Sequence, residues 1–155
     1  GQKEEQKFEK ALGTLCEVAD EFEFLRQASR LLSQFTEEFS MAGFLGRGIL
    51  YKSGLTEVLR EPEFSDEESI REFGELVDFL DEEIQTHFQP NEFDEPRVFI
   101  GSENPIREAR KYAMVLSASR TPFGEEGFFT IIGPRRMDYA KNVTILRAMR
   151  RILEA

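Results

Sequence analysis

The sequence predicts an α+β domain in which a mainly antiparallel sheet is covered by helices. A run of β-forming residues, 128–132, is followed by a glycine-proline turn and an amphipathic segment, 133–155. Two shorter β-forming runs, 97–101 and 113–119, precede it, with helical patterns between the predicted elements. Residues 2–39 contain no proline and carry apolar side chains at helical spacing, which indicates a long N-terminal helix. We expect the helices to cover one face of the sheet.

The N-terminal segment is expected to be one continuous helix. Its apolar residues recur at steps of four and three, a coiled-coil-like spacing over two to three heptads. At about 1.5 Å per residue such a helix would span more than about 50 Å, so one end would project from a compact domain. The simpler interpretation is an amphipathic helix packed on its own domain. The alternative is a linker and dimerisation helix, 1–39, that contacts a second copy through Phe8, Leu12, Leu15 and Phe22.

Residues 40–53 are apolar and rich in glycine. They predict either one bent strand or a tight hairpin around Gly46-Arg47-Gly48. The glycine order is not that of a dinucleotide-binding loop, so turn or bulge glycines are the better account. The next stretch, 54–64, suggests a short helix that Pro62 ends.

A clear helix start follows at Ser65, which forms a capping box with Glu68. The helix is expected to reach about Thr86, with a buried stripe of Ile70, Phe73, Val77, Leu80 and Ile84. Its other faces are acidic, as is common for a solvated helix. The contrast with the basic final helix would also allow the two to pair within the fold, or to orient a partner.

The second half of the chain contains the remaining strands. A loop, 89–97, leads into a short strand that ends at Gly101. Asn104-Pro105 is expected to open a short helix, with asparagine as the N-cap. The strand 113–119 then joins the strand 128–132 through a hairpin connection.

The final helix is predicted to begin at Asp138, whose carboxylate can accept amide protons of the first turn. Its apolar stripe comprises Val143, Leu146, Met149 and Leu153, and its basic side comprises Lys141, Arg147, Arg150 and Arg151. This helix is therefore expected to pack on the strand that precedes it.

Composition restricts the possible functions. A chain of 155 residues is long enough for one domain with a real core. The formal net charge of −10 argues against non-specific nucleic-acid binding, which needs a basic surface. Cys16 is the only cysteine, which excludes an internal disulfide and suits a reducing cytoplasm. No apolar run approaches membrane-spanning length, so no membrane partner is predicted.

The residue types do not favour an enzyme, and no metal site or cofactor is predicted. His87 is the only histidine and lies near a predicted helix C-terminus, where a structural role is expected. Cys16 has no histidine nearby in the sequence to activate it. Arg135-Arg136 would allow an anion to bind, or one arginine would pair with Asp138 or Glu103 and fasten the turn.

Three stretches together resemble the C-terminal, GAF-like region of the HrcA family of heat-inducible transcription repressors. They are Tyr51–Leu59 with Glu61-Pro62-Glu63-Phe64, then Ile100–Ile106, and Ile132–Tyr139. The third departs from the usual family form at Arg135, where threonine is common. Their order and spacing also fit the family, and residues 24–39 resemble its entering helix more loosely.

The resemblance implies that residues 40–155 form a shortened GAF-like regulatory domain. The family's winged-helix DNA-binding domain is absent from this chain, and only Ser40–Leu50 stands where relatives carry an inserted dimerisation domain. The parent protein would repress chaperone genes as a homodimer on operator DNA and would depend on the chaperonin. Candidate binding residues by family signature are Gly101, Ser102, Glu103, Asn104, Gly133, Pro134, Arg135, Arg136, Asp138 and Tyr139. The alternative is a small-molecule or anion sensor of GAF-like type.

Overall fold

A computed structural model describes residues 1–155. Five strands form one antiparallel sheet in the order β2-β1-β5-β4-β3. The strands are β1 (Phe39–Phe44), β2 (Ile49–Ser53), β3 (Arg97–Ile100), β4 (Ala113–Arg120) and β5 (Glu126–Gly133). The longer helices are α1 (Gln2–Leu15), α2 (Glu21–Thr36), α4 (Glu67–His87) and α5 (Tyr139–Leu153), and α3 (Leu55–Val58) is a single turn. The predicted α+β class with an antiparallel sheet is confirmed.

Residues 40–53 form the hairpin rather than the bent strand. A short 3-10 turn, Leu45–Arg47, joins β1 to β2, and Gly48 closes it with φ of 67°. A left-handed conformation of this kind favours glycine, which has no Cβ to clash. The short helix predicted after the hairpin is also present as α3.

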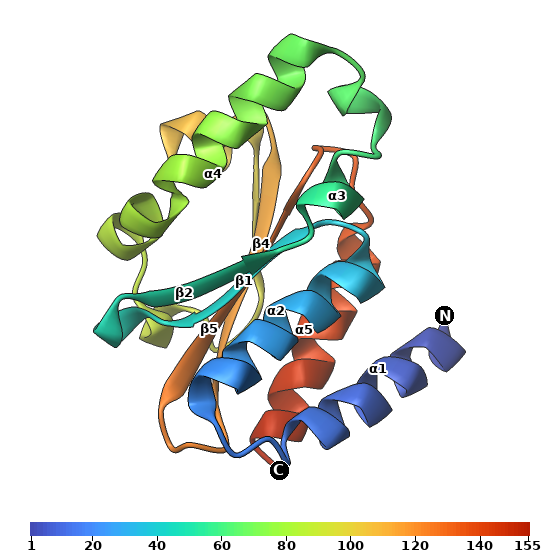
Figure 1. Cartoon of the computed structure of the whole chain (residues 1–155), viewed down its shortest axis with the longest axis vertical. Helices are drawn as coiled ribbons and strands as arrows, with labels where there is room; N and C mark the ends of the chain where they lie inside the picture. Colours follow the sequence, from blue (N-terminus) through green and yellow to red (C-terminus); the bar gives the residue numbers. More distant parts are fainter.

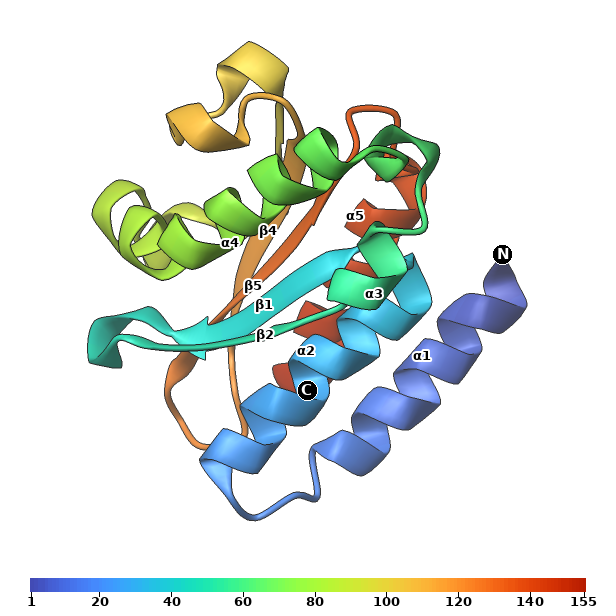
Figure 2. The same ribbon diagram turned by 45° about the horizontal axis from the view of Figure 1, so that its top comes forward.

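Helices cover both faces of the sheet, so the expectation that they cover one face is wrong. Helices α2 and α5 lie directly on one face, with α1 outside against both, and α4 crosses the other face (Figures 1 and 2). The reason is visible in β5, where Phe129 and Ile131 point to one side and Phe128 and Ile132 to the other. Because strand side chains alternate, an apolar strand of this kind needs cover on both sides.

The two faces have separate cores. We call the side covered by α1, α2 and α5 the helical face, and the side covered by α4 and its adjoining turns the aromatic face. The core of the helical face is mainly leucine and alanine, with four phenylalanines among its 19 residues. The core of the aromatic face contains Phe39, Phe64, Phe73, Phe88, Phe93, Tyr112 and Phe128, all buried.

The single long N-terminal helix is also a wrong prediction. Helix α1 ends at Leu15, and α2 begins at Glu21. Asp20 is the N-cap of α2, and its carboxylate accepts from the Glu23 amide at 2.8 Å. Helix α1 therefore folds back along α2 and α5 (Figure 2). A buried stripe gains more from packing within the domain than from projecting into solvent.

This break changes the expected dimer contact. Phe8, Leu12 and Leu15 are buried in the core of the helical face, so they do not form an exposed stripe. Phe22 alone is accessible, at 38% exposure, and the Arg47 guanidinium lies 5.7 Å from the centre of its ring. The four residues thus do not present one common surface to a second copy.

Two predicted helix starts differ from the structure. The N-cap of α4 is Asp66 rather than Ser65, because Ser65 closes the preceding 3-10 turn while the Asp66 carboxylate accepts from the Ser69 amide at 2.7 Å. Asn104-Pro105 does not open a helix. Asn104 is instead buried between two 3-10 turns, and its side-chain oxygen accepts from the Ile106 amide at 2.9 Å.

Helix α5 follows the prediction, and its basic residues are neutralised within the chain. Asp138 caps it by accepting from the Lys141 amide at 3.0 Å. Arg147 pairs with Glu95, Arg150 with Asp94 and Glu154, and Arg151 with Glu5 and Glu9. Because α4 lies on the opposite face of the sheet, the acidic and basic helices do not pair with each other. No helix is both long and apolar enough to cross a membrane.

Candidate functional site

The three sequence stretches at 51–64, 100–106 and 132–139 meet at one end of the sheet. Ile100 and Gly133 both pair with Ala113, on either side of β4. The Arg136 guanidinium reaches the first stretch, lying 2.6 Å from the Glu61 carboxylate and 2.7 Å from the Glu63 carboxylate. Segments far apart in the chain therefore share one location, which we call the signature end.

The junction between β5 and α5 is a closely packed turn at the signature end. A Cβ atom on Gly133 would lie 2.6 Å from Cδ of Glu38, so a larger residue does not fit without rearrangement. Pro134 is buried, and its carbonyl accepts from the Met137 amide at 3.0 Å. The Tyr139 hydroxyl donates to the Arg135 carbonyl, and Asp138 caps the helix. Gly133, Pro134, Asp138 and Tyr139 thus all hold this turn.

The two arginines of the junction have different roles. Arg136 pairs with Glu61 and Glu63 rather than with the expected Asp138 or Glu103, and these carboxylates raise the pKa of its guanidinium. Arg135 is exposed and forms no ion pair or hydrogen bond through its guanidinium, which lies over Gly101. Gly101 has φ of 59°, and a Cβ atom there would lie 3.0 Å from Cζ of Arg135. One arginine fastens the signature end and the other is free.

The remaining predicted residues shape the turn after β3. The Glu103 carboxylate accepts from the Ile100 amide at 3.0 Å. The side-chain oxygen of Asn104 accepts from the Ile106 backbone amide. The side-chain nitrogen of Asn104, Nδ2, is buried and has no hydrogen-bond partner. Ser102 is exposed. Gly101 donates its amide to the Tyr112 carbonyl at 3.0 Å, which ties this turn to the start of β4.

A buried carboxyl group, Glu38, was not predicted. It is 4% exposed, lies against Gly133, and its Oε1 atom has no hydrogen-bond partner. Burial is the largest cause that raises its pKa, and the charges of Glu61 and Glu63 add to it. The pKa of Glu38 is therefore about 8, despite the opposing charge of Arg136. At neutral pH this side chain is mostly protonated.

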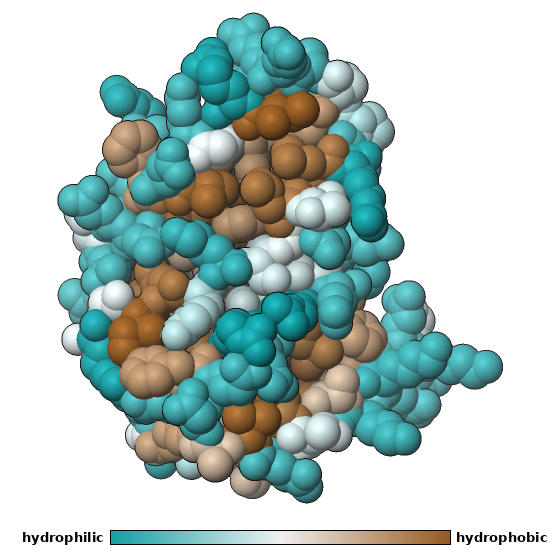
Figure 3. Space-filling model, viewed as in Figure 1, coloured by the Kyte–Doolittle hydropathy of each residue, from teal (hydrophilic) through white to brown (hydrophobic).

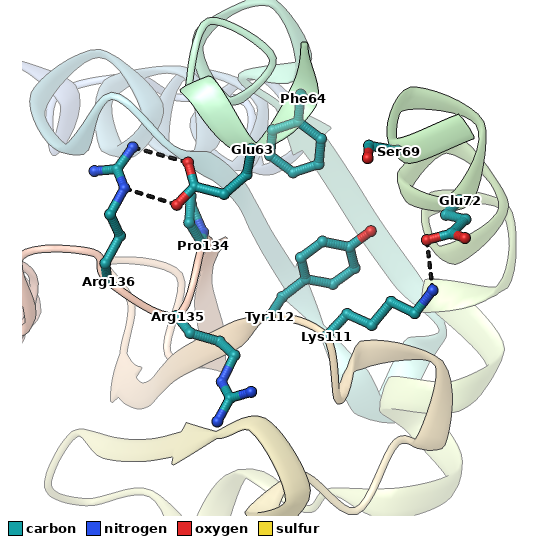
Figure 4. A pocket seen from close by; sticks show the side chains of 9 residues that line it. All are labelled: Glu63, Phe64, Ser69, Glu72, Lys111, Tyr112, Pro134, Arg135 and Arg136. Atoms are coloured by element: carbon teal, nitrogen blue, oxygen red, sulfur yellow. Dashed lines mark hydrogen bonds and ion pairs between the residues drawn. The ribbon is translucent and has the colours of Figure 1, made fainter. Parts of the chain in front are cut away.

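A cavity of about 390 Å³ opens beside the signature end on the aromatic face. Figure 4 shows its lining residues, which are Glu63, Phe64, Ser69, Glu72, Lys111, Tyr112, Pro134, Arg135 and Arg136. The Lys111 ammonium lies 2.6 Å from the Glu72 carboxylate. Tyr112 is 7% exposed, and burial, with the charge of Glu72, raises its pKa to about 12. Glu72, Lys111 and Tyr112 belong to none of the three stretches, so no sequence motif marked them.

The other candidate side chains have structural contacts. His87 lies 3.1 Å from the Glu83 carboxylate one helical turn away. Cys16 is half-buried, and burial raises the pKa of its thiol, which disfavours the reactive thiolate. No group of three or more histidine, cysteine or carboxylate side chains is arranged to hold a metal ion.

Comparison with protein families identifies the group of proteins to which this arrangement belongs. A family model described as "HrcA protein C terminal domain" matches residues 14–143, which is most of the chain. The chain belongs to the HrcA family. The three stretches that meet at the signature end are those that carry the resemblance in the sequence.

Curated HrcA proteins share this region. The chain is 29% identical over 124 residues to the heat-inducible transcription repressor HrcA of Thermodesulfovibrio yellowstonii, covering 80% of the chain and 36% of that protein. It is 31% identical over 123 residues to HrcA of Thermomicrobium roseum, covering 76% and 34% respectively. The chain thus spans about a third of the length of these relatives and corresponds to their C-terminal part. Both relatives are named as transcription repressors.

A solved structure supports the fold. A protein described as "Crystal structure of a hypothetical protein at 2.2 A resolution" superposes with a TM-score of 0.62 at 11% identity, covering 85% of this chain and 66% of that one. The α+β architecture with its antiparallel sheet is consistent with the GAF-like fold that the resemblance implies.

Proposed function

We propose that this chain is the regulatory domain of a heat-inducible repressor that acts in the cytoplasm. In this proposal it does not read DNA, and it carries dimer contacts and the response to heat stress or to the chaperonin. The observation that supports it most strongly is the family match over residues 14–143. The relatives share the name heat-inducible transcription repressor.

The electrostatics of the chain argue that another domain contacts the operator. Phosphate binding requires free lysine and arginine side chains on one surface. The net charge is −10, and Arg147, Arg150 and Arg151 on α5 are each paired with carboxylates of the same chain. We therefore assign operator binding to a winged-helix domain of the parent protein.

The isolated chain should not shift an inverted-repeat operator duplex at physiological salt. A mobility-shift titration with the operator and a scrambled duplex checks this. A salt-sensitive shift that is selective for the operator would contradict the assignment.

The outer surface of α1 and α2 is our candidate for the dimer contact. Its charges are balanced, with three lysines and three glutamates on α1 and two arginines and two glutamates on α2. Helix α4, by contrast, carries eight acidic residues against one arginine and one histidine. A two-fold contact through α4 would bring two acidic helices together and would be repulsive. A two-fold contact through α1 and α2 would not bring like charges together in this way.

Sedimentation equilibrium tests this contact. We expect the wild type to dimerise with rising concentration and a Lys7→Glu, Lys10→Glu double variant to dimerise at least about tenfold more weakly, because like charges would face each other. The matched control is Arg60→Glu, Arg107→Glu, which makes the same charge change elsewhere. A monomeric wild type, or a dimer that ignores the α1 changes, would contradict the proposal.

An apolar surface between α3 and α4 supports a chaperonin contact. Figure 3 shows apolar side chains gathered between these helices within a hydrophilic rim. Leu55 of α3 and Ile70 of α4 are both exposed, although Ile70 was expected on the buried stripe of its helix. Exposed apolar patches of this kind mark interaction sites.

Binding to chaperonin should be measured with the folded chain, below its unfolding midpoint, because unfolded chains bind chaperonins generally. We expect saturable binding that a Leu55→Ser, Ile70→Ser double variant weakens. Phe79→Ser changes an equally exposed side chain elsewhere on α4 and should leave binding unchanged. Binding that starts only above the midpoint would show a general folding substrate rather than a regulatory partner.

A further inference from the structure

We infer that the cavity beside Tyr112 binds a small organic anion, meaning a carboxylate or phosphate group attached to an apolar body. The cavity lies between the 3-10 turn Pro62–Phe64, the start of α4, the start of β4 and the β5–α5 junction (Figure 4). This site does not depend on the proposed repressor role, since it rests on the geometry of the cavity.

The cavity has an apolar wall. The rings of Phe64 and Tyr112 are stacked, with centroids 5.9 Å apart and planes inclined at 23°. Phe73 lies against both rings, with centroids 5.1 Å from each, and fixes their positions. Both wall residues are buried, so the wall is preformed. A volume of about 390 Å³ is within the usual range of small-molecule sites.

The Tyr112 hydroxyl supplies a hydrogen-bond donor that has no partner. The residue is more than nine-tenths buried, its hydroxyl forms no hydrogen bond within the chain, and it points into the cavity (Figure 4). Its pKa of about 12 means that the hydroxyl keeps its proton and can donate it. The hydroxyl oxygen is accessible from the cavity, so an acceptor bound there would receive its hydrogen bond.

The charges of the lining favour an anion. Lys111 pairs with Glu72 and Arg136 with Glu63, which leaves the Arg135 guanidinium as the cation without a partner. In this structure the Arg135 guanidinium lies over Gly101 and points away from the Tyr112 hydroxyl (Figure 4), but it can turn toward a bound group without breaking a hydrogen bond or an ion pair. An arginine fork binds carboxylate or phosphate oxygens in a bidentate manner, and an added donor such as Tyr112 would orient the group.

Titrations followed by amide chemical shifts test the site. The probes are benzoate and phenyl phosphate, which carry both a ring and an anion, and inorganic phosphate, which has no apolar body. We expect both organic probes to bind saturably and inorganic phosphate to bind more weakly. The tighter organic probe identifies the preferred anionic group.

Two variants connect the binding to the residues. Tyr112→Phe keeps the buried ring and removes the hydroxyl, and Arg135→Gln removes the free cation. Each should weaken binding of the better probe at least about tenfold, since each removes a hydrogen bond to a charged group. Arg120→Gln, which removes another exposed arginine without an ion pair, is the control and should bind normally. Amide spectra confirm folding of each variant. Absence of saturable binding by both organic probes, or binding unchanged in both variants, would overturn the inference.

Discussion

The two faces of the sheet differ in the composition of their cores. On the helical face, three helices cover a core of 19 residues that is mostly aliphatic and contains four phenylalanines. On the aromatic face, one long helix crosses the sheet over a layer of rings, among them Phe39, Phe73 and Phe128. The cavity and Phe64 and Tyr112 of its wall belong to the aromatic face. The signature end therefore opens toward the aromatic face.

The difference follows from the geometry of rings. Phenylalanine and tyrosine fill a wide gap beneath a single helix with few side chains, but they prefer edge-to-face or offset contacts at particular distances. Branched aliphatic side chains interdigitate more freely under several helices. A ring layer thus fixes its members firmly while leaving open space where it ends, here beside Tyr112.

The largest expected effect separates the two faces directly. Phe73→Ala and Phe24→Ala should each lower the free energy of unfolding by about 3–5 kcal/mol, because both rings are fully buried. Phe73→Leu should cost roughly 1–3 kcal/mol more than Phe24→Leu. The Phe73 ring packs against three other aromatic rings, those of Phe39, Phe64 and Tyr112. The Phe24 ring packs against one other aromatic ring, that of Phe123. Urea unfolding measures the difference. Equal losses of unfolding free energy in the two leucine variants would show that the contacts between rings add nothing to stability.

A second effect concerns the buried acid at the signature end. The Glu38 carboxyl keeps its proton in the folded chain up to a pKa of about 8 but loses it near 4.5 when unfolded. The stability from this proton is fully present below about pH 4.5 and is lost as the pH rises through about 8. The free energy of unfolding should therefore fall by up to about 1.4 kcal/mol per pH unit between these values.

Glu38→Gln should remove this slope, because glutamine has no proton to lose. Unfolding of the variant and the wild type between about pH 5 and about pH 8 provides the measurement. If the free energy of unfolding changed with pH in the same way in both proteins, Glu38 would ionise normally in the folded state. Glu37→Gln is the matched control, since Glu37 is exposed and adjacent.

The smallest expected effect is at the helix caps. Asp138→Ala should lower stability by about 1 kcal/mol, because the Lys141 amide loses its acceptor. Asp20→Ala, at the start of α2, should cost a similar amount. Thermal or urea unfolding measures both. If Asp138→Ala left stability unchanged but weakened binding of an anion or partner, the junction would have a functional role beyond its structural one.

Local sequence signals were sufficient to predict the elements whose residues all lie close together in the chain. The strand, turn and helix from Phe128 onward were predictable because β-formers, Gly133-Pro134 and a capping aspartate agree with one another. The start of α2 was also marked, by Asp20 followed three residues later by Glu23, but the regular apolar spacing of α1 and α2 concealed the break. Periodicity alone does not separate one helix from two that share a buried side.

The site was only partly predictable. Gly101, Gly133 and Arg135 lie in stretches that carry the family resemblance, so the sequence marked them. Glu38 was not marked, because its burial depends on the pairing of Phe39 with Ile132, which brings it against Gly133. Lys111 and Tyr112 enter the cavity only once β4 is placed between β3 and β5. Long-range pairing of this kind leaves no local pattern.

The position of β5 has a consequence for how the chain folds as it is synthesised. This strand lies in the middle of the sheet, yet it is the last strand to leave the ribosome. Until it is translated, the β1–β2 hairpin and the β3–β4 pair share no edge, and the phenylalanines between them have no continuous surface to cover. Joining residues 39 and 132 closes a long loop and is intrinsically slow. The interval in which a nascent chain risks aggregation is therefore set by its topology.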